Sequence, residues 1–303
     1  MNISMRGISK TYPGGVTALQ HLDLEIGSGM FGLLGPNGAG KSTLMKILAT
    51  LEKPSSGKIL FNNEDINENR ACVRASLGYL PQFFGVYPQL TGNEFLTYIA
   101  QLNGIPGRDL KKRVLQTLER VGLAADRDRK AKTYSGGMLR RLGIAQAVVA
   151  DPRLLIVDEP TTGLDPEERI RFRNLLTDIS REKIIILSTH IVGDISSTCE
   201  NLAVLAQGNI VYTGRPDALI ERAAGKVWQV KIRDDQFSTI ADTMQVISTI
   251  PMGEQLLLRV VGDPVPGFEM ERMQANLEDA YIHFMEAVVG QRLDDKEDIE
   301  AAA

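Results

Sequence analysis

A glycine-rich segment of this chain carries the residue types needed to bind a polyphosphate. The segment reads Gly35-Pro36-Asn37-Gly38-Ala39-Gly40-Lys41-Ser42-Thr43 and matches the phosphate-binding pattern G-x-x-x-x-G-K-[ST]. Its glycines allow backbone amides to wrap the phosphates. Lys41 is expected to reach the β- and γ-phosphates, and Ser42 is expected to place its hydroxyl on Mg²⁺. The segment therefore predicts a nucleotide site.

Two adjacent carboxylates follow the apolar run 154–157 and add hydrolytic chemistry. Asp158 is expected to support the Mg²⁺ ion, and Glu159 to polarise the attacking water as a general base. Alone, this pattern also fits an ordinary strand that ends in acidic residues. Because the glycine segment and a Ser-Gly-Gly stretch precede it at suitable distances, the catalytic interpretation is favoured.

These residues require particular elements to position them. The apolar run 30–34 leads into the glycine segment, and apolar residues recur at helical spacing over 41–51, which places phosphates at a helix N-terminus. Further strands are predicted at 3–12, 19–26, 58–61, 77–80, 154–157, 184–187 and 202–205, with helices over 91–149 and 166–180. This alternation predicts an α/β core with a mostly parallel sheet and a helical insertion.

The last part of the chain predicts a small α+β appendix. Residues 227–232 and 256–261 have strand patterns, and 277–288 has a helical pattern. Ile240, Met244 and Ile247 fit the spacing of another helix. Residues 225–303 hold 7 basic and 15 acidic residues, whereas residues 1–224 hold 27 and 23. This change predicts domains at 1–224 and 225–303, with a disordered acidic tail from about residue 292.

The motifs together resemble those of ATP-binding cassette (ABC) ATPases. Tyr134-Ser135-Gly136-Gly137-Met138, upstream of the acidic strand end, is similar to the signature of that family. The resemblance covers residues 1 to about 220. It implies a RecA-like P-loop core, an N-terminal antiparallel β-subdomain, a helical insertion at about 85–150 that carries the signature, and ATP with Mg²⁺ as cofactors.

The resemblance also assigns roles to four more positions. Tyr12 resembles the aromatic residue that stacks on adenine, although a strand tyrosine fits equally simply. Gln82 resembles the glutamine that contacts Mg²⁺ and the water and links the core to the insertion. The segment 163–165 looks like the loop across the dimer interface, and His190 resembles the histidine that hydrogen-bonds the γ-phosphate.

In the family, the signature acts on the nucleotide held by the other subunit. Ser135, Gly136 and Gly137 are therefore expected to complete a site of a second cassette, most simply a second copy of this chain in a head-to-tail dimer. Tyr134 and Met138 depart from the leucine and glutamine that are commonest there, which leaves the turnover rate open. Since all residues for hydrolysis are present, the resemblance predicts an active ATPase.

The leading functional hypothesis is the ATPase subunit of a transporter whose permease subunits are separate chains. Residues 84–88, 136–141 and 277–281 look like those of ABC-2-type exporters; an importer is the alternative within this class. A soluble ABC protein of translation or DNA repair, a GTPase or a small-molecule kinase fits less well. The aromatics of 83–88 suit either a partner helix or a seal between insertion and core. The appendix is either regulatory or a passive cap.

Composition limits the environment and the partners. No apolar run reaches membrane-spanning length and no signal-peptide pattern occurs, so a cytoplasmic location at the inner face of the cell membrane, through the permease, is expected. Cys72 and Cys199 lack the spacing of a zinc site. His21 and His283 belong to no comparable motif. Neither half of the chain is basic enough to predict nucleic acid as a partner.

Overall fold

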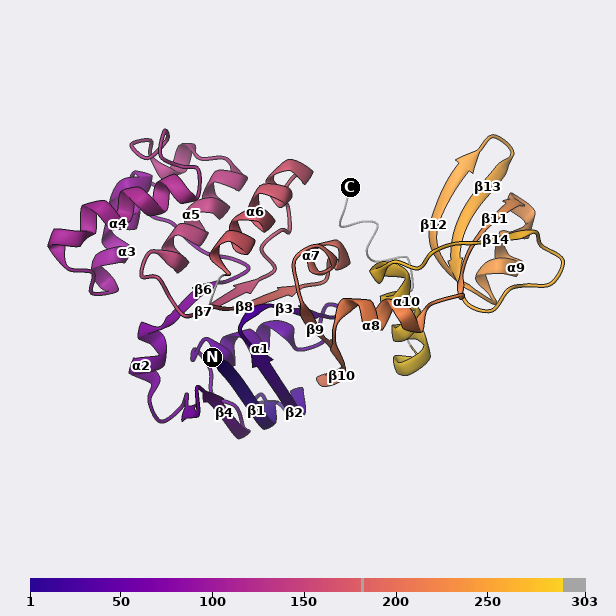
Figure 1. The fold of residues 1–303 in the computed structure, drawn as a ribbon, viewed down its shortest axis with the longest axis horizontal. Coiled ribbons are helices and arrows are strands. Elements are labelled where there is room, and N and C mark those ends of the chain that lie inside the picture. The colour runs from indigo at the N-terminus through magenta and orange to yellow at the C-terminus, as the bar shows by residue number, and fades with distance from the viewer. Residues whose placement is uncertain (181–182, 291–303) are drawn as a thin grey trace. The chain divides into compact units, whose positions relative to one another are not determined.

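The computed structural model describes residues 1–180 and 183–290, which form two compact units (Figure 1). Residues 1–213 make up the first unit, and the second begins at Gly214. Helix α8 (Pro216–Arg222) packs against α10 (Leu277–Val289), which assigns it to the second unit. The change in charge at residue 224 therefore lies inside that unit, and the fold boundary precedes it.

Two sheets build the first unit. The six-stranded sheet has the order β10-β9-β3-β8-β7-β6, with the pairs from β9 to β6 all parallel. Its strands are β3 (Gly29–Leu34), β6 (Leu77–Leu80), β7 (Leu154–Asp158), β8 (Ile184–Thr189), β9 (Asn201–Ala206) and β10 (Asn209–Gly214). Every residue of β7 and β8 is buried, as expected for parallel strands covered on both faces.

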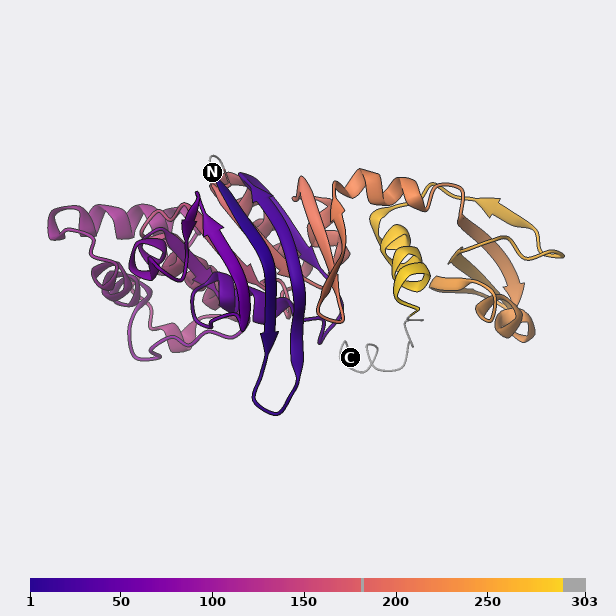
Figure 2. The same cartoon turned by 90° about the horizontal axis from the view of Figure 1, so that it is seen from below.

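The second sheet is antiparallel, with the order β2-β1-β4-β5. Its strands are β1 (Asn2–Thr11), β2 (Thr17–Gly27), β4 (Ser56–Phe61) and β5 (Glu64–Asp65). Figure 2 shows β1 and β2, in indigo, as one long hairpin. Helix α1 (Lys41–Leu48) packs against β2 and against β7 and β8, so its apolar face fills one core between the two sheets.

The helical insertion lies on the other face of the parallel sheet from the antiparallel strands (Figure 1). It comprises α3 (Gly92–Leu102), α4 (Gly107–Arg120), the 3₁₀ turn η1 (Ala131–Thr133) and α5 (Gly136–Val148). Thr91 and Glu94 form a capping box at the start of α3, which satisfies amides that the helix leaves unpaired. Helices α2 (Arg70–Ala75), α6 (Pro166–Ile179) and α7 (Val192–Ser196) complete the unit.

The second unit is an antiparallel sheet of order β12-β13-β11-β14 with helices. The elements are β11 (Val227–Arg233), η2 (Asp234–Gln236), α9 (Phe237–Ala241), β12 (Gln245–Met252), β13 (Gln255–Val261) and β14 (Met270–Arg272), besides α8 and α10. A bidentate ion pair fixes α10 to β13: Arg259 donates to the Asp279 carboxylate at 2.6 and 2.8 Å, and Asp279 is fully buried.

The predicted fold class is confirmed, with one error in the appendix. The helix expected through Ile240, Met244 and Ile247 ends at Ala241, and Ile247 lies in β12. The amide of Met244 donates to the Ile240 carbonyl and closes the last helical turn. Residues 246–250 are mostly β-branched, and this preference for a strand outweighs the helical spacing. The tail expected from residue 292 lies outside the described residues.

Candidate functional site

The glycine segment joins the end of β3 to the start of α1 and surrounds a cavity of about 200 Å³. Gly40 shows why the segment needs glycine: its φ is 107°, and a Cβ there would lie 2.5 Å from the carbonyl oxygen of Ala18. The cavity is lined by Ala18, Pro36, Asn37, Gly38, Ala39, Gly40, Lys41, Ser42, Thr43, Gln82 and Glu159. The segment thus presents its amides and the N-terminus of α1 to one cavity.

The Lys41 side chain folds back into the glycine segment that precedes it in the chain. Its ammonium donates to the carbonyl oxygens of Gly35 at 2.6 Å and Pro36 at 3.1 Å, and only 5% of the residue is exposed. Burial lowers the pKa of Lys41, while the charges of Glu159 and Asp158 oppose that shift. The side chain is therefore a pre-positioned cation at the cavity wall, where a phosphate would replace carbonyl contacts.

Glu159 connects Lys41 to His190. One carboxylate oxygen lies 3.4 Å from Lys41 Nζ, and the other lies 2.8 Å from His190 Nδ1. Burial raises the pKa of Glu159, but the hydrogen bond to His190 and the charge of Lys41 outweigh burial, so the pKa lies below its usual value. An ionised carboxylate beside the phosphate cavity has the state that a general base needs.

Asp158 ends β7 and is 2% exposed. Within the described parts of the chain, its Oδ1 atom is buried without a hydrogen-bond partner. Burial raises the pKa of Asp158, more than the neighbouring Ser188, Ser42 and Lys41 lower it. A divalent cation would satisfy this oxygen and favour the charged form. Among the described residues, no cluster of three or more acidic, His or Cys ligands occurs.

Of Gln82 and Tyr12, only Gln82 borders the cavity. Gln82 follows β6 and lines the cavity. The Tyr12 hydroxyl lies 3.3 Å from Thr43 Oγ1 and donates to Glu52 at 2.8 Å, while the ammonium of Lys10 lies 5.1 Å from the ring centroid. The structure thus brings Tyr12 to the first turn of α1, although Tyr12 is not among the residues that line the cavity.

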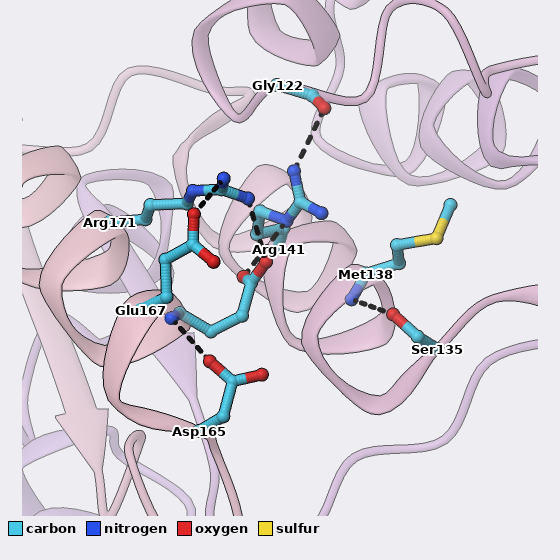
Figure 3. A network of polar contacts seen from close by, with 8 residues as sticks. Gly122, Ser135, Met138, Arg141, Asp165, Glu167 and Arg171 are labelled. Atoms are coloured by element: carbon cyan, nitrogen blue, oxygen red, sulfur yellow. Dashed lines mark hydrogen bonds and ion pairs between the residues drawn. The ribbon is translucent and has the colours of Figure 1, made fainter.

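Ser135, Gly136 and Gly137 begin α5, and the described residues that line the cavity do not include them. Ser135 caps α5 by accepting from the Met138 amide at 3.2 Å, and Asp165 caps α6 in the same way (Figure 3). A Cβ on Gly137 would lie 2.9 Å from Glu168 Cδ, so a glycine allows the two helix starts to touch.

Arg141 braces the same region between the insertion and α6. Figure 3 shows it reaching the Gly122 carbonyl, at 3.0 Å, on one side and the acidic start of α6 on the other. There it lies 3.4 Å from the Glu168 carboxylate, which Arg171 also contacts. These contacts hold the start of α5 against the start of α6 and the rest of the insertion.

Comparisons with known proteins agree with this geometry. Residues 19–162 match the family model described as ABC transporter. The Nod factor export ATP-binding protein I of Cupriavidus metallidurans is 34% identical over 293 residues, which cover 92% of this chain and 96% of the relative. This chain belongs to the ABC transporter ATP-binding proteins. The predicted family and its ATPase activity are confirmed, and ATP is the nucleotide that the family binds.

Further relatives and solved structures extend the comparison. The daunorubicin/doxorubicin resistance ATP-binding protein of Streptomyces peucetius is 35% identical, over 80% of this chain and 74% of the relative. An ATP-binding cassette solved as a dimer in a post-hydrolysis state with ADP and Pi is 25% identical. It has a TM-score of 0.64 and covers 70% of this chain and 98% of its own.

The two departures from the common signature have structural partners in this ABC ATPase. Tyr134 is 8% exposed, and its hydroxyl donates to the Asp126 carbonyl at 2.9 Å. Its ring end packs on Gly92, where a Cβ would lie 2.3 Å from the hydroxyl oxygen. Met138 is 9% exposed, and its amide donates to Ser135. Both side chains therefore pack within the insertion, and the cap on α5 is kept.

Sequence reasoning placed Arg140 only within the exporter-like segment 136–141 and gave it no role at the site, although this residue touches two segments that border the cavity. It is 9% exposed and donates to the carbonyls of Gln82, Pro160 and Glu159. The one sequence feature that could have indicated this role is the position of Arg140, one turn after the start of α5 on a face that is otherwise apolar. Glu52 was missed for a similar reason, because only the fold brings it to Tyr12.

The aromatic segment after Gln82 divides between the core and the surface. Phe84 packs against α5, where a Cβ on Gly143 would lie 2.5 Å from its Cζ atom. Phe83 and Tyr87 are 87% and 56% exposed. The Tyr87 ring stands edge-on to Tyr98 with centroids 5.9 Å apart. One aromatic side chain thus seals the insertion, and the others remain at the surface.

Proposed function

We propose that this chain is the ATP-hydrolysing subunit of an exporter and drives separate membrane-spanning subunits. The observation that carries the proposal is the meeting of Lys41, Glu159 and His190 at the glycine-segment cavity. The export direction is supported by relatives named for the export of Nod factor and for drug resistance. The described residues include no helix long and apolar enough to cross a bilayer, so the proposal places this chain at the inner membrane face through its permease.

On this proposal, each residue of the site has one task. The glycine-segment amides and Lys41 hold the phosphates, and Ser42, Asp158 and Gln82 hold Mg²⁺, which neutralises developing phosphate charge when bound. Glu159 takes the proton of the attacking water, and His190 orients that carboxylate while it faces the γ-phosphate. Tyr12 stacks on the adenine at the first turn of α1.

We infer that the active form is a two-fold, head-to-tail dimer of this chain. Ser135, Gly136 and Gly137 lie at a helix start outside the chain's own cavity, so a second copy must present them to the nucleotide. The ADP-bound cassette solved as a dimer supports this arrangement. ATP binding then closes the dimer, and hydrolysis reopens it.

The exposed aromatic patch of Tyr87, Pro88, Leu90 and Tyr98, with Phe83 nearby in sequence, suits an apolar helix of the permease. Replacing Tyr87 and Tyr98 by serine should lower the amount of membrane-spanning permease that co-purifies with this chain. Basal ATPase activity should be unchanged, since neither ring touches the nucleotide cavity. Equal co-purification of the variant would contradict this assignment.

The ATPase proposal is tested with purified protein. Phosphate release that requires both ATP and Mg²⁺, with a mass that doubles on ATP binding, is the expected result. Light scattering after gel filtration gives the mass. A protein that stays monomeric with ATP bound and still hydrolyses it at full rate would contradict the dimer.

A further inference from the structure

We propose that Arg140 is a positioning residue that joins the signature segment to the catalytic carboxylate. One guanidinium would thereby connect the half-site that this chain uses itself with the half-site that it offers to a partner. The inference rests on the proposed dimer, since only a dimer gives the signature segment a nucleotide to meet.

The contacts of Arg140 are made to backbone rather than to side chains. Nε donates to the Pro160 carbonyl at 2.6 Å, Nη1 donates to the Gln82 carbonyl at 2.8 Å, and Nη2 donates to the Glu159 carbonyl. A guanidinium has a planar fork of five donors, so one side chain can hold three acceptors from two segments in fixed relative positions. A lysine ammonium at this place would be a single point and could not reproduce the fork.

The Glu159 backbone needs such support. Its φ is 46°, a left-handed conformation that residues other than glycine rarely adopt unless their surroundings hold it. The Glu159 amide donates to the Ser188 carbonyl at 2.9 Å, and its carbonyl accepts from Arg140. Both sides of the residue are thus fixed, and the turn directs the carboxylate to His190 and Lys41.

Arg140 lies on the same helix as Ser135, Gly136 and Gly137, little more than one turn from the start of α5. Contact of that helix start with a partner's nucleotide therefore acts on the helix that carries Arg140. Through its three hydrogen bonds, a shift of α5 reaches Glu159 and Gln82 in the other half-site. The structure thus contains a direct path by which nucleotide at one site positions the base at the second.

The test compares Arg140→Met, which keeps an unbranched apolar stem, with Arg140→Lys, which keeps the charge. We expect Arg140→Met to lower kcat on the order of 10- to 100-fold, as a misplaced catalytic group does. The Kd for ATP should remain unchanged, because Arg140 bonds only to backbone carbonyls and touches neither the glycine segment nor Lys41, which hold the phosphates. The Hill coefficient for the dependence of hydrolysis on ATP concentration should be above one in the parent and should fall to one in Arg140→Met. Arg140→Lys should restore part of kcat but not this cooperativity.

Arg74 provides a matched control in the same unit. It donates to the carbonyl of Thr50 at 3.0 Å, and Thr50 also has a left-handed backbone, with φ 59°. This site lies at the far end of α1 from the cavity. Arg74→Met removes the same kind of bond and should leave kcat and the Hill coefficient at parental values.

Several results would overturn the inference. One is that Arg140→Met keeps the parental kcat and Hill coefficient. Another is that Arg74→Met loses as much kcat as Arg140→Met. A third is that the affinity of Arg140→Met for ATP falls in parallel with its kcat. If Arg140→Met does not fold, the Arg140→Lys variant decides by the same measurements, with thermal melting to show that it is intact. A parental protein that does not hydrolyse ATP or dimerise would instead refute the proposed function.

Discussion

Glu159→Gln should stop hydrolysis while ATP continues to bind. The carboxylate is 4% exposed and is held by His190 Nδ1 at 2.8 Å and Lys41 Nζ at 3.4 Å. Glutamine has the same shape and keeps an oxygen that accepts hydrogen bonds, but it loses the charge and the basicity. A positioned general base contributes about 10²- to 10⁴-fold in rate, which corresponds to about 3 to 5 kcal/mol of activation free energy.

The assay is phosphate release at saturating ATP and Mg²⁺, with ATP affinity measured in parallel by calorimetry. A fall in kcat within that range, an unchanged or tighter Kd, and a dimer that persists with ATP are the expected results. The phosphate ligands are untouched by this change, so affinity should not decline. Hydrolysis at the parental rate would show that Glu159 is not the base, and the assignment of the site would fail.

Three further predictions concern the same cluster. Lys41→Ala should weaken ATP binding by about tenfold or more, because a charge-assisted contact to phosphate is lost; undiminished affinity in calorimetry would refute this. Asp158→Asn should abolish Mg²⁺-dependent hydrolysis yet raise the Tm of the nucleotide-free protein, because burial raises the pKa of Asp158 and its charge costs stability at neutral pH; a lower Tm would count against it. Since the folded pKa of Glu159 lies below its usual 4.5, its contribution to stability is present above pH 4.5 and is lost as the pH falls through the folded value. The Tm advantage of the parent over Glu159→Gln should therefore shrink below pH 4.5, and a constant difference down to pH 3 would contradict that origin.

Much of the fold could be predicted because the residues that bind nucleotide also mark where strands end and helices begin. The glycine segment must end one strand and begin a helix, so its position also located β3 and α1. The buried strands β7 and β8 were recognisable as continuous apolar runs, since parallel strands covered on both faces do not alternate. The charge change at residue 224 indicated a second unit but not its first helix.

What the sequence could not provide depends on contacts between distant segments. The role of Arg140 requires the carbonyl of Gln82, 58 residues away, and hydrogen bonds to backbone leave no trace in residue types. The strand at Ile247 was missed because apolar spacing fitted a helix, while β13 pairs with this segment and makes it a strand. The exposed positions Phe83 and Tyr87 likewise became distinct from Phe84 only in the folded unit.

In the proposed dimer, a second copy of the chain completes each nucleotide site. Mixing Lys41→Ala with Gly136→Asp tests it, since each variant spoils a different half-site. A Cβ at Gly136 would meet no atom within 4 Å among the described residues, and an acidic residue suits a helix start, so this variant should fold. Random pairing gives about half mixed dimers with one intact site each, so the mixture should regain ATPase activity, up to the level of about a quarter of the parental rate that independent sites would give. A mixture no more active than either variant alone, or a fully active Gly136→Asp protein, would contradict the account.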